Sequence, residues 1–305
     1  MTSQAQAHRN VLPPTTHMGH AHLKVSDLPR ALAFYQDLLG LKEEGREGNT
    51  VWLAARAGGP VLLVLTAIPG ARPKPRGTTG LYHIAIRLPT REALANIFRR
   101  LLDARWSFQG FSDHKVSEAL YLADPDGNGL ELCWDRPADR WPRGNGQILM
   151  RTDPLDIEDL LQGATPSPLH PESVIGHVHV HVRDLDEAEA FYHRTLGLDV
   201  TLREYPGARF FAAGGYHHHV GTNIWAGQGA PPPPPEAVGL AYMTLVVPDA
   251  GHVARLAQQA EAADYLHYRN EQGFLGVDDA GNAVWVTAQD IPENAGRLLK
   301  ATQTP

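Results

Sequence analysis

The segment HKVSEALYLADPDGNGLE (114–131) holds a histidine, a tyrosine and a carboxylate whose residue types suit acid–base or metal chemistry. His114, Tyr121 and Glu131 fall on two predicted strands joined by the turn DPDGNG. A carboxylate inside a sheet is costly unless it is paired, protonated or bound to a metal. His83 lies on a predicted strand upstream. An imidazole and a carboxylate that converge would supply two ligands of a 2-His-1-carboxylate triad, which leaves positions on Fe(II) open for substrate and oxygen.

Two other stretches concentrate histidine. In HVHVH (177–181) the three histidines alternate with valine, so their side chains share one face of a predicted strand. A pocket lining or a half-exposed strand face would both explain His179 and His181. GGYHHHVG (214–221) places three consecutive histidines on a second predicted strand. Imidazole can exchange a proton near neutral pH and can bind a metal, so this triple histidine is a candidate for either role.

The chain repeats itself at a constant offset of 157 residues. HAHLKVSDLPRALAFYQDLLGL (20–41) aligns without gaps with HVHVHVRDLDEAEAFYHRTLGL (177–198), and 12 of the 22 positions are identical. Each copy predicts a short strand, then an amphipathic helix that begins after an Asp N-cap, Asp27 or Asp184, and ends at a glycine. This degree of identity indicates a duplicated structural unit.

A weaker pair of repeats begins at GLYHIAIRLP (80–89) and GLAYMTLVVP (239–248). The repeated unit is β-α-β-β-β, and one such unit is too small to bury both faces of its sheet alone. We therefore expect an α+β fold in which four modules, numbered 1 to 4 in chain order, pair into two half-barrel domains. The predicted organisation is an N-terminal tail (1–17), a first half (18–135) with modules 18–67 and 79–135, a linker (136–173), a second half (174–290) with modules 174–227 and 238–290, and a C-terminal tail (291–305).

Composition narrows the classes of function. The net charge of −7 argues against nucleic-acid or anionic-membrane partners, and no apolar run approaches the length of a transmembrane helix. The N-terminus lacks the apolar core of a secretory signal. Cys133 is the single cysteine and lies in the apolar run LELCW, so we expect a buried spectator in a cytoplasmic protein. The run Pro231–Pro235 is interpreted as a stiff spacer loop.

The spacing from His114 through Leu120-Tyr121 and DPDG to Glu131 resembles the signature of extradiol ring-cleavage dioxygenases of the vicinal oxygen chelate superfamily. One departure is Ser112, where the signature usually has Gly, Asn, Thr, Ile or Val. The whole chain beyond residue 18 resembles bacterial catechol 2,3-dioxygenase-like proteins with two tandem halves. The resemblance implies paired β-α-β-β-β modules and cleavage of a catechol-type substrate by O2 to a ring-opened semialdehyde.

Residue roles follow from this resemblance. His83 and Glu131 correspond to metal ligands, and His114 and Tyr121 to residues that hydrogen-bond substrate. Fe(II) is the expected metal, with Mn(II) as the alternative. The partners are a catechol-type small molecule and O2, and the chain is compatible with a homo-oligomer.

The second metal histidine depends on which module pairs with module 2. Module 3 offers His177, and its triple histidine places His218 at the family's catalytic position. Module 1 offers His20, but the corresponding later strand is apolar. In module 4, Tyr242 and Trp285 replace the ligands. We therefore expect modules 2 and 3 to pair, with His20 in place of His177 if modules 1 and 2 pair instead.

Two other functions compete with the dioxygenase. A metal-dependent glyoxalase-type lyase or isomerase would need a fourth protein ligand, for which His219 is the candidate. A non-enzymatic protein of the bleomycin-resistance type would sequester an aromatic ligand and would not need a redox metal.

Overall fold

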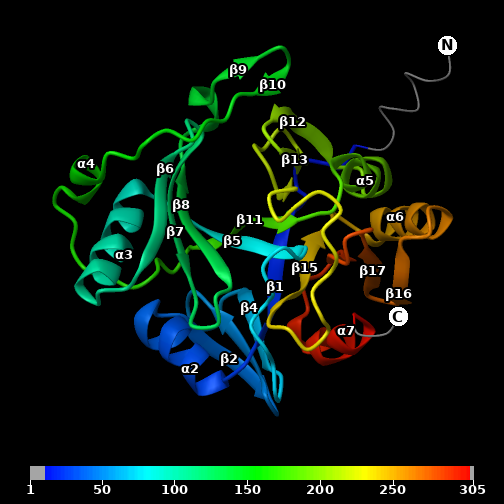
Figure 1. The fold of residues 1–305 in the computed structure, drawn as a ribbon, viewed down its shortest axis with the longest axis horizontal. Helices are drawn as coiled ribbons and strands as arrows, with labels where there is room; N and C mark the ends of the chain where they lie inside the picture. The colour runs from blue at the N-terminus through cyan, green and yellow to red at the C-terminus, as the bar shows by residue number, and fades with distance from the viewer. Residues whose placement is uncertain (1–10, 303–305) are drawn as a thin grey trace.

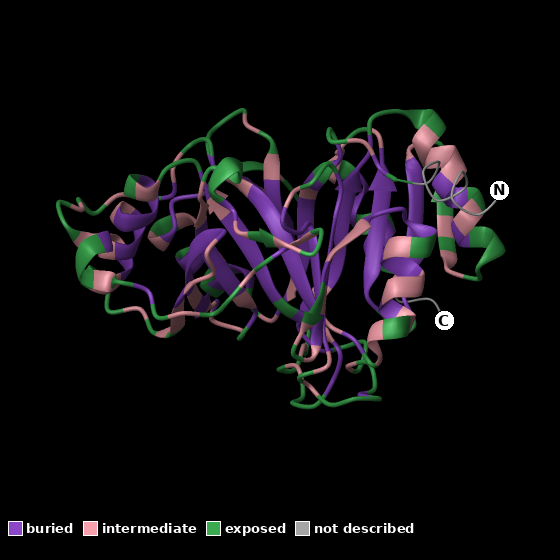
Figure 2. Ribbon diagram, turned by 90° about the horizontal axis from the view of Figure 1, so that it is seen from above, coloured by how far each residue is buried: buried purple, intermediate pink, exposed green. Residues whose placement is uncertain are grey.

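Two eight-stranded curled sheets lie side by side in the computed structural model, which describes residues 11–302 (Figure 1). The first ten residues of the predicted N-terminal tail and the last three of the C-terminal tail lie outside the described residues. The strands form the buried interior of the molecule, and most of the helices cover their outer faces (Figure 2). This is the predicted α+β architecture of four modules in two half-barrels.

Each module has the predicted order of one strand, one helical segment and three strands. Module 1 contains β1 (His17–Val25), α2 (Leu28–Leu32), the π-helical η1 (Ala33–Leu38), β2 (Lys42–Glu47), β3 (Thr50–Ala54) and β4 (Val61–Ala67). Module 2 contains β5 (Gly80–Leu88), α3 (Arg91–Asp103), β6 (Phe108–Asp113), β7 (Ser117–Ala123) and β8 (Gly129–Asp135). Module 3 contains β11 (Val174–His181), α5 (Leu185–Glu189), the π-helical η3 (Ala190–Thr195), β12 (Asp199–Tyr205), β13 (Ala208–Ala212) and β14 (Val220–Asn223). Module 4 contains β15 (Gly239–Val246), α6 (Ala250–Ala262), β16 (Leu266–Asn270), β17 (Gly273–Val277) and β18 (Ala283–Thr287).

The modules pair 2 with 3 and 1 with 4. The first sheet has the order β16-β17-β18-β15-β1-β4-β3-β2, and the second β12-β13-β14-β11-β5-β8-β7-β6. In each sheet two modules meet through antiparallel pairing of their opening strands, β1 with β15 and β5 with β11. The expected pairing of modules 2 and 3 is confirmed, and sequential pairing of modules 1 and 2 is excluded.

Short local motifs fix the repeated helices and link the two barrels. Asp27 and Asp184 are the predicted N-caps, and each side chain accepts hydrogen bonds from the first helical turn. The helical Tyr35 of module 1 donates its hydroxyl to Asp124, at 3.1 Å, in the DPDGNG turn of module 2. Its repeat equivalent Tyr192 makes the same 3.1 Å bond to Asp278 in module 4. These buried bonds join modules that do not share a sheet.

The barrel of modules 1 and 4 is filled by its own side chains. Tyr242 and Trp285 are fully buried on its sheet, and Leu298 and Leu299 pack against them. Those leucines belong to α7 (Ala295–Ala301), which follows the 3₁₀ turn η4 (Pro292–Asn294). The segment that we predicted as a C-terminal tail is thus a structural plug, because its apolar residues cover the aromatic floor of this barrel.

The predicted linker 136–173 carries small elements of its own: a helix packs beside α3 of module 2, and a hairpin lies beside β12 of module 3 (Figure 1). They are the 3₁₀ turn η2 (Ala138–Arg140), the hairpin β9 (Arg143–Gly144) and β10 (Gln147–Ile148), and α4 (Ile157–Leu161). Over residues 11–302, no helix is long and apolar enough to cross a lipid bilayer.

His22 gives the filled barrel a measurable pH dependence. Burial, with repulsion from His20 and Lys24, lowers the pKa of His22 from 6.5 to about 3. The unfolded chain therefore binds this proton from about pH 6.5 downward, while the folded protein does not until about pH 3. Stability should fall as pH decreases through that window, by up to about 1.4 kcal/mol per pH unit for this group. Urea unfolding between pH 6.5 and 4.5 should show a shallower loss for His22→Gln than for wild type; parallel curves would contradict this.

Candidate metal centre

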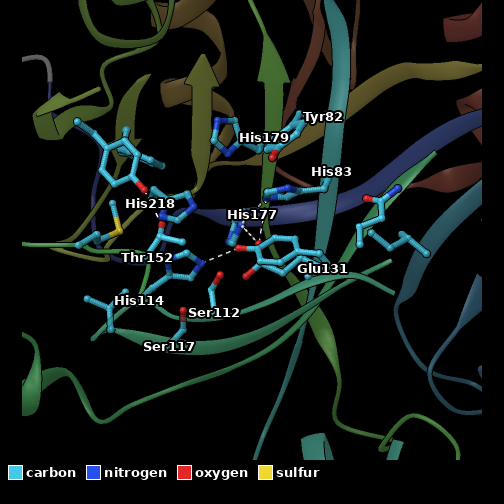
Figure 3. A pocket seen from close by; sticks show the side chains of 18 of the residues that line it. Tyr82, His83, Ser112, His114, Ser117, Glu131, Thr152, His177, His179 and His218 are labelled. Atoms are coloured by element: carbon cyan, nitrogen blue, oxygen red, sulfur yellow. Dashed lines mark hydrogen bonds and ion pairs between the residues drawn. The ribbon is translucent and has the colours of Figure 1, made fainter. Parts of the chain in front are cut away.

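Three buried ligand atoms converge where β5 lies between β11 and β8 (Figure 3). His83 Nε2 lies 3.3 Å from His177 Nε2 and 3.0 Å from Glu131 Oε2, and the third side, His177 to Glu131, measures 3.2 Å. The register explains this convergence, because Ala85 on the central strand pairs with both His177 and Glu131. His83 lies two residues from Ala85 and so shares its face of the sheet, and the small alanine leaves space between the ligands.

Electrostatics keep this cluster in a ligating form. Burial alone would raise the pKa of Glu131, but the charge and hydrogen bonds of His177 and His83 hold it well below its ordinary value. Burial lowers the pKa of His177, so the imidazole tends to be neutral, although Glu131 opposes the shift. An ionised carboxylate and a neutral imidazole are the forms of these side chains that bind a divalent cation.

The donor set fits a transition metal. Within the described part of the chain, His83, Glu131 and His177 are the group of metal-binding side chains whose ligand atoms all lie within 4.8 Å of one another. Two imidazoles and one carboxylate form the set used by non-haem Fe(II) oxygenases, and the same atoms also suit Mn(II) or Zn(II). A buried carboxylate crowded by two imidazole nitrogens is stabilised by a cation at their centre.

His114 and Tyr121 form a hydrogen-bonded pair beside the cluster. His114 Nε2 lies 2.6 Å from the Tyr121 hydroxyl, and its Nδ1 lies 2.6 Å from the carbonyl oxygen of Arg151. A carbonyl only accepts, so Nδ1 carries a proton. Burial, with the charge of Glu131, raises the pKa of Tyr121 well above its ordinary value, so the phenol stays protonated. The tight turn after His114, with Lys115 at φ 69°, returns the chain directly into β7.

The triple histidine lies in a loop and not on the predicted strand. β14 begins only at Val220, because Gly214 and Gly215 have φ of 64° and 76°, a left-handed conformation that ends the preceding strand. Consecutive residues of a strand would point to opposite faces, whereas His217, His218 and His219 are all buried, in three different environments.

His218 is the member of this triplet that faces the cluster (Figure 3). Its ring contacts that of His177, with centroids 3.9 Å apart and the ring planes inclined by 45°. Its Nδ1 lies 2.8 Å from His217 Nδ1, and His217 Nε2 lies 3.1 Å from Asp135 Oδ1. Burial and the nearby histidines lower the pKa of His218 well below its ordinary value, so it is neutral at pH 7. His218 is thus connected through His217 to a carboxylate outside the cavity lining.

Two sequence candidates lie away from the cluster. The ring of His219 accepts a hydrogen bond from the Ala213 amide at 3.2 Å and does not line the cavity, which argues against its use as a fourth ligand. His20 lies in the other barrel, where Nε2 bonds to the Tyr242 hydroxyl at 2.9 Å and Nδ1 to Asp290. His20 is therefore not the alternative to His177. Cys133 is buried, as predicted, and burial raises the pKa of its thiol well above the ordinary value.

The cluster opens into a cavity of about 310 Å³ with contributions that sequence reasoning missed. His179, for which pocket lining was one of the two sequence interpretations, lines it, and Asn223 donates a 3.0 Å hydrogen bond to its Nε2. The strand face that His179 shares with His177 was the basis of that interpretation. Met150 and Thr152 reach the cavity from the linker, Trp225 from a turn and Tyr205 from the end of β12, and no spacing in the sequence relates these positions to the cluster. Ser112, the departure from the signature, also lines the cavity.

A family model and a curated relative place the chain in the same protein family. The family model described as the glyoxalase/bleomycin resistance protein/dioxygenase superfamily matches residues 17–132 and 174–268. A catechol-2,3-dioxygenase of Bacillus subtilis (strain 168) is 43% identical over 275 residues, which cover 88% of this chain and 95% of that protein.

Solved structures share the fold at low sequence identity. A putative dioxygenase from Bacillus subtilis subsp. subtilis str. 168 superposes with a TM-score of 0.62 at 13% identity, covering 92% of this chain and 88% of that one. Glyoxalase I from Zea mays gives a TM-score of 0.55 at 16% identity, covering 93% and 95%. At these identities the likeness concerns the fold alone.

The cluster predicts a test by ligand removal. Protein purified anaerobically with Fe(II) should hold about one metal ion per chain, and His177→Ala should lose most of it because one of three ligands is gone. His20→Gln, at the repeat-equivalent position of the other barrel, should retain the wild-type metal content. Elemental analysis after desalting makes the comparison. Retention by His177→Ala with loss by His20→Gln would contradict the site.

Proposed function

Because the chain belongs to the glyoxalase/bleomycin resistance protein/dioxygenase superfamily, we propose that it is an extradiol dioxygenase that cleaves a catechol-type aromatic with O2. The observation that carries this proposal is the convergence of His83, His177 and Glu131. Two hydrogen-bonded pairs that can exchange protons, His114 with Tyr121 and His217 with His218, lie beside this cluster. The 43% identical relative named catechol-2,3-dioxygenase supports the same reaction.

Fe(II) is the metal that best suits the three ligands and this reaction, with Mn(II) as the alternative. When bound, it supplies a Lewis acid for the diol and a redox centre between the diol and O2. The chain's own residues bind and orient the substrate and move its protons.

Tyr121 and His114 can accept a substrate proton. With His114 protonated at Nδ1 and neutral, the Tyr121 hydroxyl donates to His114 Nε2, and its oxygen is free to accept a hydrogen bond from a diol hydroxyl. When a proton reaches His114, the phenol turns and donates to a substrate oxygen instead. The high pKa of Tyr121 keeps it a donor in both states.

His218 is suited to a second proton transfer on another wall of the cavity. Burial alone would raise the pKa of Asp135, but the contacts with His217 and Arg87 outweigh burial and lower it. The carboxylate is therefore ionised and accepts a hydrogen bond from Nε2–H of His217. With the ring proton of His217 on Nε2, its Nδ1 accepts a hydrogen bond from His218 Nδ1. His218 Nε2 is left unprotonated and available as a general base.

The competing functions lose their specific support. The glyoxalase-type interpretation relied on His219 as a fourth ligand, and its ring is engaged outside the cavity. A protein that only sequesters an aromatic compound has no use for a buried metal triad or for the hydrogen-bonded histidine pairs around it.

Oxygen uptake tests the proposal. Anaerobically reconstituted Fe(II) protein should consume O2 in a 1:1 ratio with added catechol and yield a ring-opened aldehyde acid that contains both oxygen atoms of ¹⁸O2. A full complement of metal with no O2 uptake on catechols would reject a dioxygenase.

Variants of the proton-handling residues should separate chemistry from metal binding. His218→Ala should retain the metal but lower kcat by roughly 10²–10⁴-fold, the range for loss of a general acid–base group. Tyr121→Phe should also retain metal and slow turnover. His219→Gln is the matched control within the triplet and should stay near wild-type kcat. A fully active His218→Ala would exclude this role.

The hydrogen bonds that link Asp135 to His217 and His217 to His218 predict that a substitution at Asp135 changes the activity of His218. Asp135→Asn removes the charge that orients His217, so the tautomer of His218 is no longer fixed and kcat should fall at least about tenfold with KM little changed. His217→Gln should act in the same direction. Nitrogen-15 NMR of the histidine rings would report the tautomer directly, and an unchanged His218 tautomer in Asp135→Asn would contradict the arrangement.

A further inference from the structure

We propose that the cavity selects uncharged catechols with an apolar ring substituent and rejects catechols that carry an acidic substituent. This inference rests on the proposed dioxygenase function and specifies its substrate class. It comes from the charge, the apolar lining and the size of the space in front of the metal cluster.

The cavity offers no permanently charged cation to an anionic substituent. All of its lining residues are described, and none is a lysine or an arginine. Its one carboxylate, Glu131, is held by His83 and His177. The two nearby arginines are placed elsewhere: Arg87 pairs with Asp135 at 3.3 Å, and Arg151 lines a neighbouring groove.

The walls away from the metal ligands are mainly aromatic and apolar. Tyr82 and Trp225 line the cavity with ring centroids 5.4 Å apart, and they remain 39% and 46% exposed. Large apolar side chains left open in this way are typical of ligand contacts. Phe210 and Met150 also line the cavity.

The cavity is larger than one unsubstituted ring needs. Its volume is about 310 Å³, whereas a dry cavity of about 150 Å³ accommodates benzene. A ring substituent that packs against the aromatic side chains of the wall would be stabilised by burial of apolar surface. A carboxylate in that position would lose part of its hydration, find no lysine or arginine, and be repelled by the negative charge of Glu131.

A pair of substrates of similar shape tests the selection by charge. 4-Isopropylcatechol and 3,4-dihydroxybenzoate differ mainly in whether a branched substituent is apolar or anionic. For the Fe(II) protein, kcat/KM should favour 4-isopropylcatechol by about 100-fold or more. Methyl 3,4-dihydroxybenzoate keeps the electron withdrawal without the charge and should behave more like the isopropyl compound than like the acid.

Binding is measured separately from turnover. Under anaerobic conditions, the melting temperature of the Fe(II) protein should rise with 4-isopropylcatechol and remain nearly unchanged with 3,4-dihydroxybenzoate at the same concentration. Selective binding without O2 uptake would reject the dioxygenase function but support the selectivity. O2 uptake with equal use of the acid and the isopropyl compound would support the function and overturn the selectivity.

Two variants assign the selectivity to this cavity. Gln109→Arg places the missing cation on the cavity wall and should raise kcat/KM for 3,4-dihydroxybenzoate about tenfold, relative to the neutral substrate. Trp225→Ala should raise KM for 4-isopropylcatechol about tenfold more than KM for catechol. Arg151→Gln should leave the ratio between acid and neutral substrate unchanged. A wild-type preference for the acid that Arg151→Gln removes would overturn the proposal.

Discussion

The antiparallel pairing of β5 with β11 is the interaction on which the rest of the site depends. It joins two modules whose opening strands start about ninety residues apart in the chain, and it places His177 opposite Ala85. The parallel pairing of β5 with β8 brings Glu131 to the other side of the same alanine. Without this strand pairing, two imidazoles and a carboxylate from three strands would not share a space that one cation can fill.

The second barrel shows what the same scaffold does without this chemistry. Thr244 pairs with Trp285 in the register in which Ala85 pairs with Glu131, and Tyr242 occupies the position equivalent to His83. Bulky aromatic rings thus replace ligands, and α7 covers them. The hydrogen bond from His20 to Tyr242 takes the place of the contact between His177 and His83. The two barrels thus share a backbone arrangement, and the side chains at the positions of His83 and Glu131 determine which barrel has the ligands for a metal.

The repeats allowed much of this arrangement to be predicted. Strand order within a module, the Asp N-caps and the module pairing followed from the alignment and from the loss of ligand residues in module 4. His218 of the triple histidine lines the cavity, but the strand assignment of the triplet was wrong, because two left-handed glycines turn the chain there. Met150 and Thr152 reach the cavity from the linker, and no periodicity links a linker to a distant cavity. Asp135 likewise became visible only through its contact with His217.

The central claim is that modules 2 and 3 together build one metal site. Anomalous diffraction at the iron edge, from crystals grown anaerobically with Fe(II), locates the ion independently of activity. The account predicts one strong peak within bonding distance of His83 Nε2, His177 Nε2 and a Glu131 oxygen, with no peak near His20. A peak beside His20 and Asp290, or no ordered iron at His83, His177 and Glu131, would contradict it.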